Sequence, residues 1–352
     1  MRNYPWTHTT QCTEILPSIG DKLCVYTNAS FSNGRGISIF TTPKLAEEFA
    51  NLPAFKDQSA LKDVNVDSGA WYAHELPGKG VGLLANKSLK SKDRVTAYTP
   101  ALIAHLEGDL GTMEREKWYR LAISQLPDAT QHAYLQLAFV YGQDIIRVQD
   151  IVKANTFQLH VGGQNHLAVF PETSRLNHAC SPNAQYYLDP GLLTHFVHAT
   201  RPIALDEEIT ISYTSPLDLT EVRQQHLQDG FLFTCTCSRC TNQEATDDTV
   251  ETIQRLQAAL NDWSESSHGT PKLAETVLSL YRREGLEGFL DIPYGFAALA
   301  YNAVGDSKEA EKFARLAQES ILLKDGPWTP NMQIWNELLK DPMKHWSYKR
   351  RM

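Results

Sequence analysis

Three cysteines stand within six residues of one another, at Cys235, Cys237 and Cys240, and this spacing constrains the fold more than any other feature of the chain. Thiolates at this density suit a tetrahedral metal ion, and zinc is the usual occupant. A structural zinc completes its shell with a fourth protein ligand. Cys180 is the preferred fourth ligand because the two remaining cysteines stand near the N-terminus, and His178 is the competing candidate. A loop of free or disulfide-bonded thiols is the alternative without metal.

A zinc ion bound there would join two distant stretches of the chain. It would hold residues 231–240 against the loop that begins at Asn177. A structural zinc contributes on the order of 10 kcal/mol to folding. We therefore expect metal loss to disorder the segment 231–240.

The composition is that of a globular protein, and its charge argues against some partners. The 352 residues are 42% apolar and 21% charged, and 33 basic residues oppose 41 acidic ones, for a net charge of −8. This balance argues against direct binding of nucleic acid or of an anionic membrane through a broad basic surface, and it is compatible with attracting a basic peptide. The chain has no apolar run long enough for a transmembrane helix,.

Cys12 and Cys24 stand apart from the other cysteines. In a reducing compartment they would be free thiols, and in a secreted protein they would be the obvious disulfide pair. Residues 1–11 lack the apolar stretch of a signal peptide,. We therefore expect the cytoplasm or the nucleus, with the secretory pathway as the alternative if a signal peptide has been trimmed.

Hydrophobic periodicity divides the chain into three regions and predicts a mixed α+β fold. Residues 1–70 predict a β-hairpin and a helix, residues 71–240 a β-rich domain with a helical insertion at 101–154, and residues 241–352 a helical domain. Within that last domain, residues 297–320 resemble one tetratricopeptide unit, two antiparallel helices around a Gly-Asp turn. A helical bundle that caps the main domain is the alternative. We expect a monomer.

Three motifs in a fixed order resemble the SET-domain methyltransferases. They are Asn177-His178-x-Cys180-x-Pro182-Asn183, then acidic-Glu-x-Thr-x-x-Tyr213, then the Cys-x-Cys-x-x-Cys run that ends at Cys240. Their order and spacing are closest to the SET-and-MYND group and its fungal relatives, and the resemblance covers roughly residues 71 to 240. It implies a SET-type β-fold with a zinc site after the domain. It also implies methyl transfer from S-adenosylmethionine to the side-chain amine of a protein or peptide lysine.

The resemblance also assigns roles to individual residues. Tyr213 is similar to the family's catalytic tyrosine, and Phe157 and Phe231 resemble the walls of its lysine channel. In the family, the cofactor contacts a glycine-containing loop, an asparagine ahead of the channel, the Asn-His pair, the tyrosine and an aromatic residue over the adenine. The matching residues in this sequence are Lys79, Gly80, Val81, Asn155, Asn177, His178, Tyr213 and Phe233. The family's zinc ligands match Cys180, Cys235, Cys237 and Cys240.

The chemistry of methyl transfer explains why such residues are needed. A lysine has a pKa near about 10.4, so it is mostly protonated at neutral pH and must lose its proton before it attacks. An apolar channel disfavours the ammonium form by desolvation, and Phe157 and Phe231 suit such a channel. The Tyr213 hydroxyl can orient the amine and the methyl group, helped by weak CH···O contacts. Orientation of this kind contributes several kcal/mol, within the roughly 7–11 kcal/mol attributed to proximity.

The sequence also departs from the SET-and-MYND pattern. Residues 100–154, where the family carries a cysteine-rich MYND module, contain no cysteine. Two alternatives to a lysine methyltransferase stay open on these grounds. One is a SET-fold binding module without turnover, against which the intact Tyr213 and Asn177-His178 argue. The other is an enzyme repurposed for a small molecule of a biosynthetic pathway.

Overall fold

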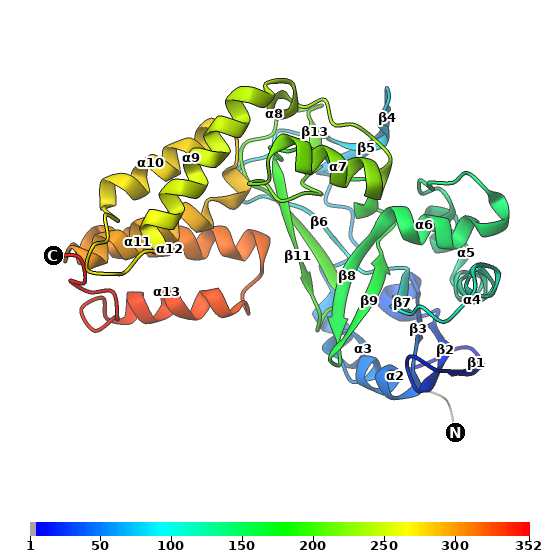
Figure 1. Cartoon of the computed structure of the whole chain (residues 1–352). Helices are drawn as coiled ribbons and strands as arrows, with labels where there is room; N and C mark the ends of the chain where they lie inside the picture. Colours follow the sequence, from blue (N-terminus) through cyan, green and yellow to red (C-terminus); the bar gives the residue numbers. More distant parts are fainter. Residues whose placement is uncertain (1–4) are drawn as a thin grey trace. The chain divides into compact units, whose positions relative to one another are not determined.

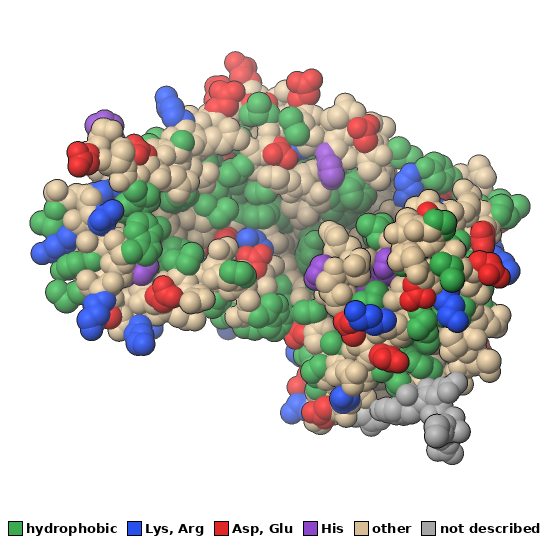
Figure 2. Space-filling view, turned by 60° about the horizontal axis from the view of Figure 1, so that its bottom comes forward, with side chains coloured by type: hydrophobic (Ala, Val, Ile, Leu, Met, Phe, Trp, Pro, Cys, Tyr) green, Lys and Arg blue, Asp and Glu red, His purple; other side chains and the backbone are tan. Residues whose placement is uncertain are grey.

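The computed structural model describes residues 5–352, which form two compact units. The first unit runs to Gly82 and adds Arg94–Leu176 and Leu188–Phe196, and the second comprises Leu83–Asp93, Asn177–Tyr187 and Val197–Met352. Among the described residues, no helix is long and apolar enough to cross a membrane. Basic and acidic side chains are interspersed on the face drawn in Figure 2.

A six-stranded sheet forms the centre of the first unit (Figure 1). Its order is β1-β2-β3-β7-β9-β8, and all neighbouring strands are antiparallel except the parallel pair β3 and β7. The strands are β1 (Gln11–Leu16), β2 (Asp21–Asn28), β3 (Ile37–Thr41), β7 (Leu102–His105), β8 (Thr156–Val161) and β9 (Gln164–Val169). The predicted hairpin is β2 and β3, joined by the tight turn α1 (Phe31–Gly34).

Helices cover both faces of this sheet, which explains why strands such as β3 are buried along their whole length,. On one face of the sheet, Leu23, Val25 and Leu102 pack into a hydrophobic core with a first set of helices. The residues next to them along the strands pack into a core with a second set on the other face. The first set is α4 (Thr112–Ser124), α5 (Asp128–Leu135) and α6 (Arg147–Asn155); the second is α2 (Pro43–Ala50) and α3 (Pro53–Lys56). The alternation follows from the two-residue period of a strand.

The stretch predicted to be helical from residue 100 onward differs from the prediction in two places. It opens with β7, an interior strand whose short apolar run has no period to distinguish it from a helix,. The helical stretch is also interrupted after Leu135, and in the loop that follows the carboxylate of Asp150 accepts the backbone N–H groups of Val140 and Tyr141 at 3.0 and 2.7 Å.

Cys12 and Cys24 lie opposite each other on β1 and β2 and form a disulfide. Of the two alternatives for this pair, free thiols or a disulfide, the structure therefore has the disulfide. Disulfides persist in oxidising compartments and are rare in the cytoplasm and nucleus, and the compartment of this chain stays a prediction.

The second unit is built around β13 (Glu208–Ile211). It pairs in parallel with β10 (Asn177–His178) and antiparallel with β5 (Gly80–Ala85) at Leu83 and Leu84. The chain's other strand orders are β10-β13-β5-β4, where β4 is Trp71–Leu76, and β11-β12-β6. Their bounds are β6 (Arg94–Tyr98), β11 (Ala184–Asp189) and β12 (Thr194–Ala199).

The C-terminal part of this unit is helical, as predicted, and the α+β class is confirmed. Its helices, yellow to red in Figure 1, are α9 (Gln243–Asn261), α10 (Pro271–Arg283), α11 (Asp291–Ala303), α12 (Ser307–Lys324) and α13 (Pro330–Lys340). Small residues such as Ala298 and Ala310 in their common core let α11 and α12 approach closely,. Gly305, at φ +82°, turns the chain between them, and the side chain of Asp306 caps α12,.

Candidate functional site

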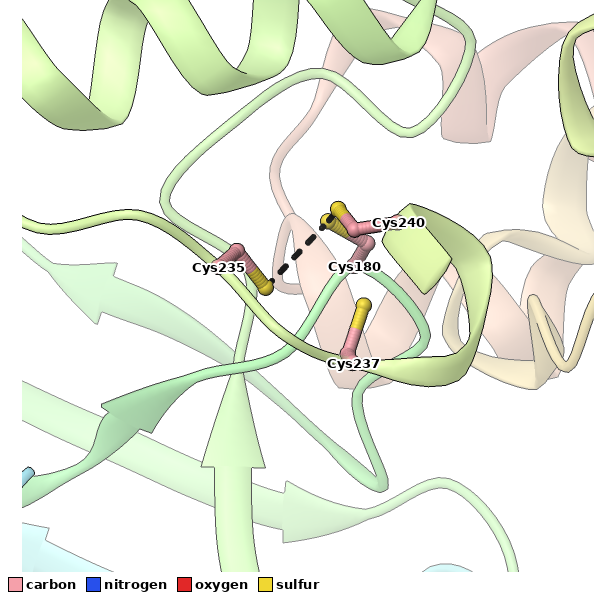
Figure 3. Close-up of side chains that lie close together, drawn as sticks. All are labelled: Cys180, Cys235, Cys237 and Cys240. Atoms are coloured by element: carbon pink, nitrogen blue, oxygen red, sulfur yellow. Dashed lines mark hydrogen bonds between the residues drawn. The ribbon is translucent and has the colours of Figure 1, made fainter. Parts of the chain in front are cut away.

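The four predicted zinc ligands come together in the second unit (Figure 3). The sulfur atoms of Cys180, Cys235, Cys237 and Cys240 all lie within 4.8 Å of one another. The Sγ of Cys180 is 3.6 Å from that of Cys240 and 4.0 Å from that of Cys235, and none of the four forms a disulfide. Four converging thiols at this spacing can hold one tetrahedral metal ion. Cys180, and not His178, is the fourth member of the group.

Helix α7 (Thr220–Phe231) and the short helix α8 (Ser238–Thr241) set the positions of three of these cysteines. The side-chain amide of Gln224 in α7 forms two hydrogen bonds to the backbone of Cys235. Its Nε2 donates to the carbonyl oxygen at 2.8 Å, and its Oε1 accepts the N–H at 2.9 Å. Cys240 donates its N–H to the carbonyl of Cys237 at 2.9 Å. Sequence reasoning missed Gln224, because one glutamine on a polar helix carries no distinguishing signal.

The ring of His178 lies between the cysteine cluster and Tyr213. Its Nδ1 accepts the backbone N–H of Tyr213 at 3.0 Å, so its proton is on Nε2,. That Nε2 lies 3.2 Å from the Sγ of Cys180 and donates to it. The imidazole of His178 is therefore used by the protein itself, in one tautomer, and links a thiol of the cluster to the backbone of the predicted catalytic residue.

Two asparagines of the Asn177–Asn183 motif form hydrogen bonds to residues of the strand β13. The Nδ2 of Asn177 donates to the Oε1 of Glu208 at 3.0 Å. Asn183 is 1% exposed; its Oδ1 accepts the N–H of Thr210 at 2.8 Å, and its Nδ2 donates to the carbonyl of Glu208 at 2.8 Å. Asn183 thus fixes the register of the strand that leads to Tyr213.

Replacing Asn183 with Ala is expected to lower the free energy of unfolding by about 1–3 kcal/mol, because it leaves buried backbone groups of β13 without partners. Thermal unfolding of the purified chain measures this effect. The matched control is Asn331→Ala, since Asn331 is exposed at the start of α13 and should be neutral. An Asn183→Ala chain as stable as the control would contradict the role given to Asn183.

Aromatic side chains surround Tyr213. Its ring centroid lies 4.7 Å from that of Phe231 and 5.4 Å from that of His178, and the ring centroid of Phe233 lies 6.1 Å from that of His178. Burial raises the pKa of Tyr213, and Glu208 adds to the rise. The Tyr213 hydroxyl is therefore protonated at neutral pH and can donate as well as accept a hydrogen bond.

Leu232 separates the two phenylalanines and ends α7 in the left-handed conformation, at φ 57°. Its own side chain is 54% exposed, while Phe231 and Phe233 on either side both pack against the Cys180–Leu227–Cys235 core. A left-handed residue reverses the chain at a helix end, so Leu232 supplies the turn that brings both rings to one cluster.

We expect Leu232→Ile to destabilise the chain by about 1 kcal/mol, because a β-branched residue adopts the left-handed conformation with difficulty. Leu232→Gly should match or exceed the wild-type stability, since glycine adopts it without strain. Thermal midpoints of the three chains test this ranking. A glycine variant that is the least stable of the three would show that the side chain, rather than the backbone conformation, matters at this position.

The remaining predicted residues lie in the first unit. Lys79, Gly80 and Val81 are exposed, and Gly80 has φ +71° at the start of β5. Asn155 is 7% exposed and closes α6, its Nδ2 donating to the carbonyls of Ala138 and Ile151 at 2.7 and 2.8 Å.

Phe157, the predicted channel wall, belongs to an aromatic cluster of the first unit. Its ring centroid lies 4.3 Å from that of His195 and 5.8 Å from that of Phe170. Burial lowers the pKa of His195 to about 3, so its ring is neutral at physiological pH and brings no positive charge to Phe157,. His195 was not predicted, because a histidine in a strand carries no signal of its burial.

Comparison with known proteins identifies a SET domain at residues 80–214. The chain is 27% identical over 285 residues to the histone-lysine N-methyltransferase set5 of Schizosaccharomyces pombe, covering 77% of this chain and 83% of the relative. It is 29% identical over 223 residues to the N-lysine methyltransferase SMYD2-A of Danio rerio and 28% over 213 residues to SMYD2 of Homo sapiens. These alignments cover 56% and 59% of this chain, and 49% and 48% of the relatives, so the chain spans about half the length of the SMYD2 proteins.

The chain therefore contains a SET domain, and it is similar to proteins named as protein-lysine N-methyltransferases. This confirms the resemblance drawn from the three motifs. The six cysteines of the sequence are taken up by the disulfide and the four-cysteine cluster, so no MYND zinc module lies in this sequence.

Proposed function

We propose that this chain transfers a methyl group from S-adenosylmethionine to the side-chain amine of a lysine in a protein or peptide. The observation that carries the proposal is the convergence, in one unit, of Tyr213, His178, Phe231 and Phe233 beside the four-cysteine cluster. The relatives of this chain are named as lysine N-methyltransferases, which supports the same chemistry. We propose a protein lysine as substrate and a monomeric enzyme.

The donor set supports a structural zinc. Four thiols with sulfurs within 4.8 Å of one another fit a closed tetrahedral site without an open position for water,. Zinc would be held by Cys180, Cys235, Cys237 and Cys240, and it would fasten the segment that carries Phe231 and Phe233 to the loop after β10. This role is structural, because every ligand position is taken by protein.

S-adenosylmethionine, when bound, supplies the methyl group from its sulfonium. We propose that Asn177 and Phe233 hold its adenosine part, together with the backbone of His178, since the imidazole of His178 is already bonded at both nitrogens. The loop of Lys79, Gly80 and Val81 and the residue Asn155 complete the proposed set. The exposed glycine loop offers backbone that a ligand can approach closely,.

Tyr213 and its aromatic neighbours would act on the substrate lysine. The Tyr213 hydroxyl is protonated and its side chain is half-buried, so it can accept or donate one directed hydrogen bond and orient the amine,. The ring of Phe231 packs beside that of Tyr213, and Phe157 is the second proposed wall of the channel. An apolar surround favours the neutral amine over the ammonium ion, which must lose its proton before it attacks.

Calorimetric titration with S-adenosylmethionine, on a sample whose zinc content is measured, tests the proposed pocket. We expect micromolar binding and about one zinc ion per chain, and roughly 5- to 150-fold weaker binding in Phe233→Ala, because stacking on an adenine contributes about 1–3 kcal/mol. Trp346→Ala, which removes an exposed aromatic of the C-terminal segment, should bind as the wild type does. No binding by the folded, zinc-loaded chain would overturn the proposal.

A further inference from the structure

The first unit contains a cavity that none of the predicted cofactor, channel or zinc residues lines. Its volume is about 390 Å³, and it is bounded by α4, α6 and the ends of β7 and β9. Apolar side chains make up most of its wall, among them Ile146, Val152 and Leu167. Leu106 and Tyr141, which also line it, are each 53% exposed. A mostly apolar cavity of this size, with apolar side chains at its exposed edge, is suited to a small organic molecule.

A buried hydroxyl in this cavity is left without a partner. Tyr119 of α4 lines the cavity and is 3% exposed, yet within residues 5–352 its hydroxyl forms no hydrogen bond. Tyr134 of the same hydrophobic core, by contrast, donates its hydroxyl to the carbonyl of Val148 at 3.0 Å, as buried tyrosines usually do,. Burial raises the pKa of Tyr119, so the hydroxyl stays protonated and can donate,. Tyr119 therefore offers a hydrogen-bond donor to a molecule in the cavity.

The charged groups of the cavity favour a negatively charged ligand. The carboxylate of Glu107 is 1% exposed and is bonded to Arg115 and to a backbone N–H at 2.8 Å. Asp150 is also 1% exposed, and its carboxylate accepts two backbone N–H groups at 3.0 and 2.7 Å. Both carboxylates are thus covered and already bonded. Lys153, in contrast, is exposed, and its ammonium lies 4.3 Å from the ring centroid of Tyr141 and donates to that hydroxyl. No carboxylate of the described residues pairs with Lys153, so its charge can pair with an anion.

We propose that this cavity binds a small apolar carboxylic acid, whose carboxylate accepts hydrogen bonds from Lys153 and Tyr119 and whose hydrocarbon part packs against Val152 and Leu167. The two donors come from α6 and α4, which share one hydrophobic core. A neutral alcohol would use the Tyr119 hydroxyl but leave the charge of Lys153 unpaired, and an amine would be repelled by that charge. The inference concerns a second ligand and does not depend on methyl transfer.

Titration of the purified full chain with phenylbutanoate and with octanoate tests the site. Phenylbutanol and octanol are the neutral analogues, and binding is measured by calorimetry and by ligand-observed NMR. The variants are Tyr119→Phe, which removes only the hydroxyl, and Lys153→Gln, which removes the charge. Lys340→Gln is the matched control, since Lys340 is exposed at the end of α13 in the second unit. Thermal unfolding shows whether each variant is folded.

We expect at least one of the acids to bind the wild-type chain with a Kd of about 1 mM or lower, and its alcohol to bind at least about tenfold more weakly. Tyr119→Phe and Lys153→Gln should each weaken binding of the acid about tenfold or more, because each removes a hydrogen bond to a charged group. Lys153→Gln should leave binding of the alcohol unchanged, which a merely structural role of Lys153 would not predict. Lys340→Gln should change neither.

Three results would overturn the proposal. If neither acid binds at concentrations up to about 10 mM, the cavity holds water only. Equal binding of acid and alcohol, or an equal loss of both in Lys153→Gln, would exclude recognition of the carboxylate. An acid that binds Lys153→Gln and Tyr119→Phe as tightly as wild type occupies another place. If Tyr119→Phe does not fold, Lys153→Gln decides, because that side chain is exposed and its replacement leaves the core intact.

Discussion

Tyr213→Phe should reduce methyl transfer by about a hundredfold or more while S-adenosylmethionine still binds. The substitution removes one hydroxyl and keeps the ring, which packs 4.7 Å from Phe231. His178 bonds to the backbone N–H of Tyr213, which the variant retains. A loss of orientation at the reacting centre costs on the order of 10²-fold in rate. Single-turnover transfer to a peptide lysine and calorimetric cofactor binding separate the two effects.

The control for Tyr213→Phe is Tyr301→Phe in α11. The Tyr301 hydroxyl donates to Glu275 at 2.6 Å on the surface of the helical region, so its loss should not change transfer. A Tyr213→Phe chain that transfers methyl groups at the wild-type rate would remove Tyr213 from the catalytic role. Loss of cofactor binding together with transfer would instead make Tyr213 a part of the pocket wall.

Removal of zinc should have the largest effect on stability. Cys235→Ser, or stripping with a chelator, removes the link between the segment after α7 and the loop after β10. Structural zinc sites contribute on the order of 10 kcal/mol, so we expect a lower thermal midpoint. Because Phe231 and Phe233 lie in the segment that the metal fastens, we also expect loss of cofactor binding. Metal analysis, thermal unfolding and calorimetry on the same samples measure all three.

The disulfide supplies a matched control for the zinc experiment. A Cys12→Ser and Cys24→Ser double variant changes cysteines of the first unit only, so its zinc content and cofactor binding should equal those of wild type. A Cys235→Ser chain that retains a full equivalent of zinc would contradict the four-cysteine site. The same holds for a metal-stripped chain that unfolds at the wild-type temperature.

The sequence was most informative where chemistry fixes both residue type and spacing. Cysteines that bind one metal must be cysteines and must stand close together, so the cluster at Cys235–Cys240 and its distant member Cys180 could be predicted. The order of Asn177-His178, Tyr213 and that cluster predicted the family, which the SET domain at residues 80–214 confirms. The helices after residue 250 were predictable because each carries one apolar face.

Other features depend on contacts that a linear pattern does not reveal. β7 is buried on both faces, so its short apolar run lacked the alternation of a strand. Gln224 and Asn183 act through hydrogen bonds to other segments of the chain, and such polar residues are ordinary in a sequence. His178 was predicted as a cofactor residue and as the competing zinc ligand. Its ring instead joins Cys180 to the backbone of Tyr213, which only the folded arrangement shows.

Incubation of the zinc-loaded chain with isotope-labelled S-adenosylmethionine and an array of lysine peptides tests the central claim most directly. The account predicts label on the side-chain amine of lysine in at least one peptide, and none with Tyr213→Phe or with peptides in which arginine replaces lysine. Cofactor binding without labelled peptide on a broad array, but with label on a small amine, would favour an enzyme acting on a small molecule. Binding with no transfer to any amine would contradict the account and leave a SET-fold binding module.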